Sequence, residues 1–223
     1  MAMARRLMVS DDDELVREAY RSFFANRRDF EIVAEAADGV RAVEAYAATQ
    51  PDVVLMDLQM PRMNGVQATA EISRQWPDAC IVMLTTFGSR EHIVPALRAG
   101  AAGYLLKDSG PEALVNGINQ ALAGEMPLAA SVRRELVRSL TDDDTGRTDP
   151  AVQLSPRELE LLGWLAHGLG NAEIANKMFL SESSVKQQLA GIGQKLGASS
   201  RTQILVRAIQ LGLTDPRRLP PLE

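Results

Sequence analysis

The chain has 223 residues, of which 46% are hydrophobic and 24% are charged, and its formal net charge at pH 7 is −5. This composition is ordinary for a globular protein, excludes disorder throughout, and leaves room for one large domain or two modest ones. No stretch approaches the roughly 20 uncharged apolar residues of a membrane span. Acidic residues follow the N-terminus where a signal peptide needs an apolar core, so we expect a cytoplasmic protein.

Short apolar runs alternate with segments of helical length along residues 1–122. Five runs have the length of strands and are rich in Val, Ile and Leu: "RLMVS", "FEIVAEA", "DVVLMD", "CIVMLTT" and "GYLLK". Strands that alternate with helices predict an α/β fold, with a mostly parallel sheet covered by helices on both faces. The single cysteine, Cys80, begins the fourth run, and we interpret it as a small buried apolar residue.

Polar side chains stand at the ends of four of these runs. Asp11 and Asp12 follow the first run and Asp57 ends the third. Thr85 lies at the end of the fourth run, and Lys107 ends the fifth. In open α/β sheets the binding crevice lies outside the carboxyl ends of the strands. We therefore expect these side chains to converge.

Three carboxylates in one crevice repel one another unless a cation lies between them or a proton neutralises one. Hard oxygen ligands suit Mg²⁺, which keeps several waters and binds phosphate together with one or two carboxylates. With a lysine and a hydroxyl nearby, the site could stabilise a transferring phosphoryl group, which Asp57 could accept as an aspartyl phosphate. Each residue also has a simpler interpretation: the Asp run as a helix N-cap, Asp57 as a turn residue, and Lys107 as a surface charge. Their coincidence at successive strand ends favours the site.

Residues 5–123 resemble the receiver domain of two-component response regulators, on the acidic pair, "VVLMDLQMPRMNG", "MLTT" and "GYLLKD". The resemblance implies a five-stranded parallel sheet of flavodoxin-like order. It also implies these roles: Asp57 as phosphorylation site, Asp11, Asp12, Asp57 and the Gln59 backbone carbonyl at Mg²⁺, Lys107 at the phosphoryl group, and Thr85 with Tyr104 as a switch pair. Tyr104 could also be only a half-buried strand aromatic. Asp108 stands where many receivers have a proline.

A linker separates this half of the chain from the rest. The segment "TDDDTGRTDP" (141–150) has no apolar residue, which is typical of a solvated linker. Before it, "ASVRRELVRSL" predicts a short amphipathic helix. We therefore expect a first domain over residues 1–123, a linker with a short helix over 124–151, and a second domain over 152–223.

Helical signals begin again at Ser155. Ser155, Pro156 and Glu158 read as an N-cap, a first-turn proline and a capping-box acid. The following helix is predicted to bury one face, formed by Leu159, Leu162, Leu165 and Ala166. Further on, a short helix "NAEIANKM" meets a second helix that starts at Ser181 across the tight turn "FLSE". Two helices around such a turn predict a helix-turn-helix, whose second helix enters the major groove of DNA.

The segment 152–213 resembles the C-terminal helix-turn-helix of LuxR-type, or NarL/FixJ, response regulators, on Leu154, Ser155, Arg157, Glu158, "NAEIA", "LSESSVK" and "KLG". The resemblance implies that these residues contact DNA: Ser184, Lys186, Gln187, Gln188 and Ala190, with Lys177 and Lys195 at phosphates. Glutamine can read adenine bidentately, whereas lysine reads guanine or attracts phosphate. Gln188 replaces a frequent histidine, and Gly170 a frequent serine.

Two features speak against DNA reading. Gly191 and Gly193 lie in the recognition helix, where each should cost about 1 kcal/mol relative to alanine, and this domain carries only a small excess of basic residues. It could therefore be a module for protein interaction or dimerisation. The amphipathic "SSRTQILVRAIQLGL" matches a family helix that pairs two such domains on a two-fold DNA site. However, Ile204, Leu205 and Ile209 could simply close the core of the bundle.

We therefore expect a DNA-binding response regulator that acts as a homodimer and is not an enzyme. Phosphorylation of Asp57 by a sensor histidine kinase or a small phosphodonor would control dimerisation and binding to double-stranded DNA. The alternative is a receiver-containing phosphoacceptor or interaction protein without specific DNA reading, and a poorer one is an autonomous phosphatase. An affinity for DNA that falls with salt would favour the first interpretation.

Overall fold

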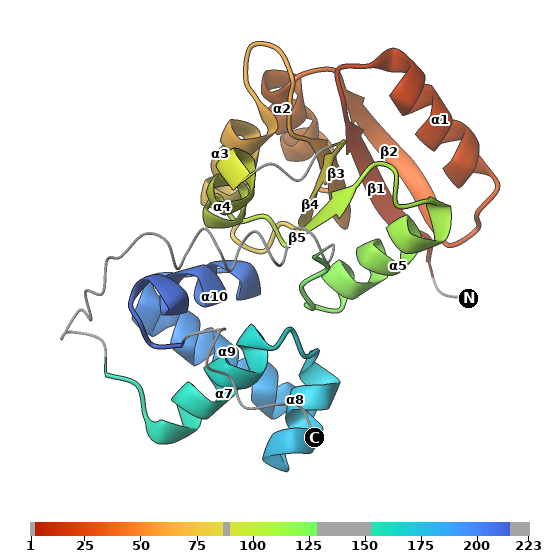
Figure 1. Cartoon of the computed structure of the whole chain (residues 1–223). Helices are drawn as coiled ribbons and strands as arrows, with labels where there is room; N and C mark the ends of the chain where they lie inside the picture. Colours follow the sequence, from red (N-terminus) through yellow and green to blue (C-terminus); the bar gives the residue numbers. More distant parts are fainter. Residues whose placement is uncertain (1–2, 87–89, 129–152, 215–223) are drawn as a thin grey trace.

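The computed structural model describes residues 3–86, 90–128 and 153–214. A five-stranded parallel sheet flanked by helices comes first, and four helices form the second part of the described chain (Figure 1). The strand order β2-β1-β3-β4-β5 confirms the predicted flavodoxin-like fold. The strands are β1 (Arg5–Ser10), β2 (Phe30–Ala36), β3 (Val53–Asp57), β4 (Ile81–Thr85) and β5 (Gly103–Leu106).

Successive residues of these strands face opposite sides of the sheet, and both sides are buried. Leu7, Val9 and Leu55 pack on one side with α1 (Glu14–Ala25) and α5 (Pro111–Leu122). Met8 and Met56 pack on the other side with three further helices. These are α2 (Gly39–Thr49), α3 (Gly65–Gln75) and α4 (Arg90–Arg98). A sheet that is covered on both faces leaves its carboxyl edge as the place where polar residues can gather.

Side-chain caps fix the helices that follow this edge. Asp13 accepts a hydrogen bond from the Leu15 N–H, so α1 begins immediately after the acidic run. Asp38 caps α2 by accepting from the Arg41 N–H at 3.0 Å. In α3, Asn64 forms a reciprocal capping box with its third helical residue, Gln67. These caps determine where the loops around the carboxyl edge end.

The second domain contains α7 (Pro156–Ala166), α8 (Asn171–Met178), α9 (Glu182–Leu196) and α10 (Arg201–Gln210). Helix α7 has the predicted capping box of Ser155 and Glu158 and the predicted proline in its first turn. The predicted buried face was wrong at one position, because Leu159 is 38% exposed, whereas Leu161 is fully buried. With 3.6 residues per turn, Leu161 shares a face with Leu162 and Leu165, and Leu159 lies to one side of it. Ala166 is partly buried.

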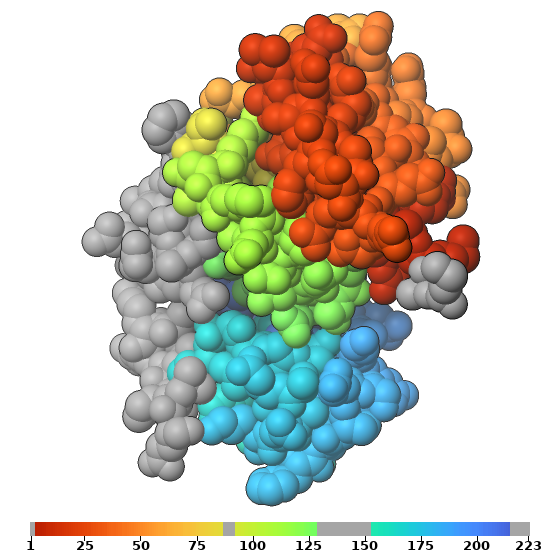
Figure 2. All heavy atoms as spheres, turned by 90° about the vertical axis from the view of Figure 1, so that its right-hand side faces the viewer, coloured from red at the N-terminus to blue at the C-terminus, as the bar shows by residue number. Residues whose placement is uncertain are grey.

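The two domains contact each other through α10. Its Gln203 amide donates to the Arg98 carbonyl at 3.0 Å, and its Thr202 hydroxyl donates to the Ala102 carbonyl at 3.3 Å. Ile204 and Ile209 of the same helix are buried, and the core of the helical domain is continuous with the sheet face that α4 covers. Figure 2 shows the cyan and blue atoms of the helical domain directly below the green atoms of the first domain, which include α5.

The chain after α5 returns along the free edge of β5. The Tyr104 N–H donates to the Pro127 carbonyl at 2.8 Å, and Tyr104 pairs in parallel with Leu128. The predicted linker helix and the acidic segment 141–150 lie outside the described residues. Within the described part of the chain, no helix has the length and apolar character needed to cross a membrane.

Candidate functional site

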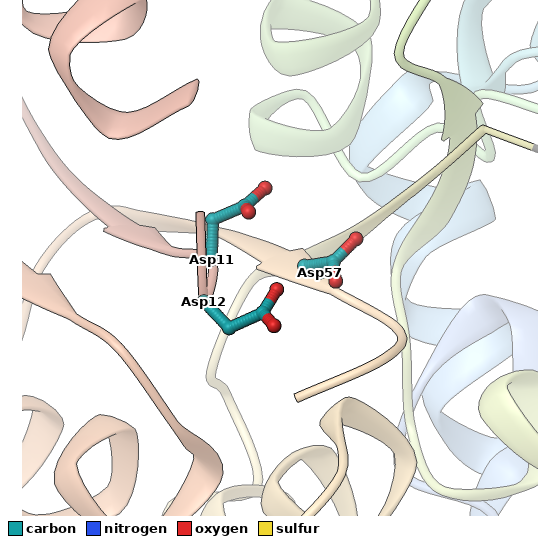
Figure 3. Close-up of side chains that lie close together, drawn as sticks. All are labelled: Asp11, Asp12 and Asp57. Atoms are coloured by element: carbon teal, nitrogen blue, oxygen red, sulfur yellow. The ribbon is translucent and has the colours of Figure 1, made fainter. Parts of the chain in front are cut away.

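Three carboxylates meet at the carboxyl edge of the sheet. Asp57 is the last residue of β3, and Asp11 and Asp12 follow β1, the strand that pairs with β3. One carboxylate oxygen from each lies within 4.8 Å of the others, and Figure 3 shows the three side chains clustered together. Asp11 and Asp57 are buried, 1% and 6% exposed, whereas Asp12 is open to solvent. The structure thus brings together the acids that the sequence placed at strand ends.

Asp13, and not the acidic pair, caps helix α1. The backbone N–H of Asp13 donates to Asp11 Oδ1 at 3.1 Å, which holds the Asp11 carboxylate at the crevice. The Asp11 N–H in turn donates to the Ala36 carbonyl of β2. The simpler interpretation of the Asp run as an N-cap therefore accounts for one of its three members.

Lys107 lies between two of the carboxylates. Its Nζ is 2.7 Å from Asp11 Oδ2 and 2.7 Å from Asp57 Oδ1, and its backbone N–H donates to the Thr85 carbonyl. Burial lowers the pKa of Lys107, but its contacts with Asp11 and Asp57 outweigh burial and raise the pKa above the ordinary value. The ammonium is therefore held in its charged form.

The environment of Asp57 disfavours its ionised form. Burial is the largest influence and raises the pKa of Asp57, and the neighbouring Asp11 raises it further. The Lys107 ammonium and the Gln59 N–H, which donates to Asp57 Oδ2 at 3.1 Å, lower the pKa without cancelling the effect of burial. One lysine therefore compensates the three carboxylates only in part.

These residues fit a hard divalent cation. The donor set is made of carboxylate oxygens only, which Mg²⁺ prefers over nitrogen or sulfur. A dication would supply the positive charge that Lys107 alone lacks. The Gln59 backbone, predicted as a further ligand, lies in the same loop, with its N–H already on Asp57.

The two residues predicted as a switch pair lie on neighbouring strands. Thr85 ends β4 and is buried, and Tyr104 of the adjacent β5 is 0% exposed. Tyr104 is thus fully buried, not half-buried as the simpler interpretation required. Burial raises the pKa of the Tyr104 hydroxyl, and the Thr85 side chain acts in the opposite direction.

The residues predicted to contact DNA are distributed over α8 and α9. Lys186, Gln187 and Ala190 are exposed, whereas Ser184 and Gln188 are partly buried. Lys186 and Ala190 line a cleft of about 1020 Å³ that the receiver side closes with residues of α3 and α4. The predicted reading face of α9 therefore points, at these two positions, toward the first domain.

Two predicted phosphate contacts have partners inside the helical domain. Lys195 Nζ lies 2.8 Å from Glu158 Oε1 and so ties α9 to α7. Lys177 lies over the ring of Trp164, with its Nζ 5.5 Å from the ring centroid. These contacts give both lysines a structural role in addition to the predicted one.

Sequence reasoning missed two residues beside the site. Arg62, in the loop after Asp57, has a φ of 64°, and its guanidinium forms an ion pair with the buried Asp38. "DG" at 38–39 after a strand is a recognisable cap signal. A left-handed arginine and its partner 24 residues away leave no comparable pattern in the sequence.

Comparison with known proteins agrees with this architecture. Residues 7–119 match the family "Response regulator receiver domain", and residues 152–208 match "Bacterial regulatory proteins, luxR family". The "Uncharacterized transcriptional regulatory protein YxjL" of Bacillus subtilis (strain 168) is 41% identical over 214 residues, covering 94% of this chain and 97% of that protein. "Oxygen regulatory protein NreC" of Staphylococcus aureus is 37% identical over 215 residues, covering 94% and 99%.

A solved structure has a similar fold over nearly the whole chain. The response regulator ChrA of a heme-sensing two-component system is 34% identical, with a TM-score of 0.53 over 96% of this chain and all of that chain. An acidic crevice on a parallel α/β domain, followed by a helix-turn-helix, defines a DNA-binding response regulator. The chain belongs to the response regulators with a luxR-family DNA-binding domain, the NarL/FixJ type.

Proposed function

We propose that phosphorylation of Asp57, with Mg²⁺ in the crevice, controls binding of α9 to DNA. The observation that carries this proposal is the cluster of Asp11, Asp12 and Asp57, in which Lys107 contacts Asp11 and Asp57 and the buried Asp57 ends β3. A sensor histidine kinase or a small phosphodonor would supply the phosphoryl group. The family supports both the donor and the DNA partner as classes.

Asp57 would act as the nucleophile. A carboxylate oxygen of Asp57 forms the new bond to phosphorus, while the bond between phosphorus and the donor breaks and the leaving group departs with the electron pair. Mg²⁺, held by Asp11, Asp12, Asp57 and the Gln59 backbone carbonyl, would neutralise charge on the phosphoryl oxygens. The Lys107 ammonium, which contacts Asp57 Oδ1, would move to contact the phosphoryl group.

Thr85 and Tyr104 would transmit the change. The new phosphoryl oxygens are strong hydrogen-bond acceptors. The Thr85 hydroxyl would therefore turn toward Asp57 to donate to one of them. Tyr104, which is fully buried, could then occupy the space that Thr85 leaves. Because Tyr104 pairs with the chain that leads out of the receiver, its movement would reach the linker.

Release of α9 would complete the response. Lys186 and Ala190 line the cleft against the receiver, so we expect the receiver to hinder the approach of a DNA duplex in this arrangement. Opening of the domains, with pairing of two chains on a two-fold site, would expose them. We place DNA contacts at Ser184, Lys186, Gln187, Gln188 and Ala190, with Lys177 and Lys195 at phosphates.

Three further points remain proposals. The division into residues 1–123, 124–151 and 152–223 is supported by the extents of the two family matches, while Pro127 and Leu128 of the proposed linker pair with β5 of the first domain. A cytoplasmic location and the lack of enzymatic turnover of a separate substrate are supported by the family of transcriptional regulators.

Intact mass after incubation with phosphoramidate tests the proposal. We expect a gain of one phosphoryl group that requires Mg²⁺, is lost with chelator, and is lost in Asp57→Ala. The same samples are then titrated with a DNA duplex that the protein selects from a random pool. Phosphorylated wild type should bind more tightly than Asp57→Ala, and the affinity of both should fall with salt.

Lys186→Ala and Gln187→Ala locate the reading face in the same titration. Loss of the preference for the selected duplex, with the mass gain intact, is the expected result. Equal affinity of phosphorylated and unphosphorylated protein for the duplex would contradict the control by Asp57.

A further inference from the structure

The loop between β3 and α3, residues 58–64, carries the backbone that flanks Asp57. Two hydrogen bonds fix the start of the loop. The Leu58 N–H donates to the Leu84 carbonyl, and the Gln59 N–H donates to the Asp57 carboxylate. Its far end closes on its start, because the Gly65 N–H donates to the Leu58 carbonyl at 3.0 Å. The middle of the loop is left to other contacts.

Those contacts come from the first turn of α2. Asp38, which caps α2, is 1% exposed, and its Oδ2 forms an ion pair with the Arg62 guanidinium of the loop. Next to it, the Gly39 N–H donates to the Met63 carbonyl at 3.0 Å. A Cβ on Gly39 would lie 2.3 Å from that carbonyl oxygen, so the loop and α2 approach as closely as the backbone allows.

Arg62 adopts a backbone conformation that does not suit it locally. Its φ of 64° lies in the left-handed region, which residues other than glycine, asparagine and aspartate rarely occupy. Such a conformation persists only where the surroundings impose it. The ion pair with the buried Asp38 is the contact that the Arg62 side chain makes in the described part of the chain.

The Asp38–Arg62 ion pair therefore lies close in sequence to Gln59, whose backbone carbonyl is a proposed Mg²⁺ ligand. Arg62 is three residues from Gln59, and the chain between them includes Pro61, whose ring fixes its φ. A shift of Arg62 is therefore passed along a short, stiff segment to the Gln59 carbonyl. The Arg62 side chain is 57% exposed whereas that of Asp38 is 2% exposed, so the ion pair has one buried partner, which also caps α2.

We propose that the Asp38–Arg62 ion pair positions the loop after Asp57 and thereby sets the affinity of the crevice for Mg²⁺. Arg62 and Asp38 are positioning residues, since neither touches Asp57, and the inference rests on the proposed Mg²⁺-dependent phosphorylation. Contacts behind the ligands of a metal commonly determine how well the ligands are oriented.

Four variants separate the ion pair from its surroundings. Arg62→Asn removes the cation and keeps a residue that tolerates the left-handed backbone. Asp38→Asn removes the charge and keeps an N-cap. Arg41→Ala is the matched control, since Arg41 also faces Asp38, with its Nε 3.8 Å from Oδ2, but lies on α2 and not on the loop. Arg62→Lys restores the charge.

Two measurements are made on the full chain. Without phosphodonor, the rise in thermal midpoint is followed as Mg²⁺ is added; with phosphoramidate, the initial rate of mass gain is followed over the same Mg²⁺ range. We expect Arg62→Asn and Asp38→Asn to raise the half-saturating Mg²⁺ concentration roughly tenfold in both measurements. The rate at saturating Mg²⁺ should stay close to that of wild type, Arg62→Lys should recover part of the loss, and Arg41→Ala should match wild type.

The outcomes are distinguishable. Wild-type half-saturation in both charge-removing variants would overturn the inference and leave the proposed function intact. An equal effect of Arg41→Ala would also overturn it, because the loss of any positive charge beside Asp38, and not the contact with the loop, would then be responsible. A wild type that gains no mass with Mg²⁺ would overturn the proposed function and this inference together.

Discussion

Asp57 occupies a position where an ionised carboxylate is unfavourable. Buried charge is costly unless it is paired, and Lys107, the cation that contacts Asp57, also contacts Asp11. The pKa of Asp57 accordingly stays above its ordinary value of 3.8, with burial as the main cause. The proposed phosphoacceptor is therefore a residue whose negative charge the surrounding protein groups stabilise only in part.

We expect Asp57→Asn to stabilise the Mg²⁺-free protein at neutral pH. Because the pKa of Asp57 is raised by folding, its stabilising contribution is present below pH 3.8 and is lost as the pH rises through the folded pKa. The thermal midpoint of the variant should be higher at pH 7 by roughly 2–4 °C, which is about 1 kcal/mol for a chain of this size. The difference should vanish toward pH 3.8.

Thermal unfolding across pH, with Asp12→Asn as the control, checks this. Asp12 belongs to the same cluster but is exposed, so its replacement should change the midpoint little. A lower midpoint for Asp57→Asn at pH 7 would show that the pairing with Lys107 outweighs burial.

The sequence predicted the residues of this crevice because each follows a strand, and parallel strands end at one edge. The structure of the crevice also explains Gly65, whose role the sequence could not reveal. A Cβ there would lie 1.9 Å from the Asp57 carbonyl oxygen, so the glycine of "MNG" permits α3 to begin directly behind the acceptor. The Arg62–Asp38 pair depends on tertiary contact and a strained backbone, which no local pattern encodes.

At the scale of elements, periodicity located the strands and helices well and their buried faces less well. The strand Phe30–Ala36 and the helix Asn171–Met178 have the predicted limits. Leu159 is exposed because the neighbouring leucines of α7 offer two overlapping faces, and only packing against the other helices selects one. The two glycines of α9, which spoke against a stable recognition helix, have different explanations.

Gly193 is required by a close approach and Gly191 is not. A Cβ on Gly193 would lie 2.6 Å from the Ala198 carbonyl oxygen, whereas nothing lies within 4 Å of one on Gly191. We expect Gly191→Ala to stabilise the helical domain by about 0.5–1 kcal/mol. Gly193→Ala should destabilise it by about 1–3 kcal/mol, because backbone must move.

Urea unfolding of both variants tests this pair. The chain has two tryptophans, so a Trp76→Phe background leaves Trp164 of α7 to report on the helical domain alone. A stabilising effect of Gly193→Ala would mean that α9 and the following turn are not packed as closely as described.

At the scale of the whole molecule, the described parts of the two domains meet through a continuous apolar core and a small set of polar contacts. Arg98 at the end of α4 faces Gln210 of α10, and with the amide oxygen turned toward the guanidinium, Nε donates to it at 2.8 Å. Lys186 and Ala190, which we propose contact DNA, line the same cleft as Arg98. Sequence could not predict this arrangement, since each domain is complete as a pattern and nothing local records how two domains meet.

We expect Arg98→Ala to raise the affinity of the unphosphorylated protein for DNA. Loss of about 1 kcal/mol of contact shifts a closed-to-open equilibrium by roughly threefold to tenfold. Arg74→Ala is the control, because Arg74 lines the same cleft but pairs with Glu71 of its own helix. Binding to the selected duplex and the radius of gyration from X-ray scattering report the change. An unchanged affinity with a larger radius would show that closure does not limit DNA binding.

The short pairing of residues 126–128 with β5 determines where a fragment containing only the first domain should end. A receiver expressed alone and ended at residue 123 would lose the Pro127 carbonyl that accepts from Tyr104, together with the buried Leu128. A bare, apolar strand edge is a template for pairing with other chains. Such a fragment would tend to aggregate for reasons unrelated to signalling, whereas one that ends after Leu128 keeps its sheet covered.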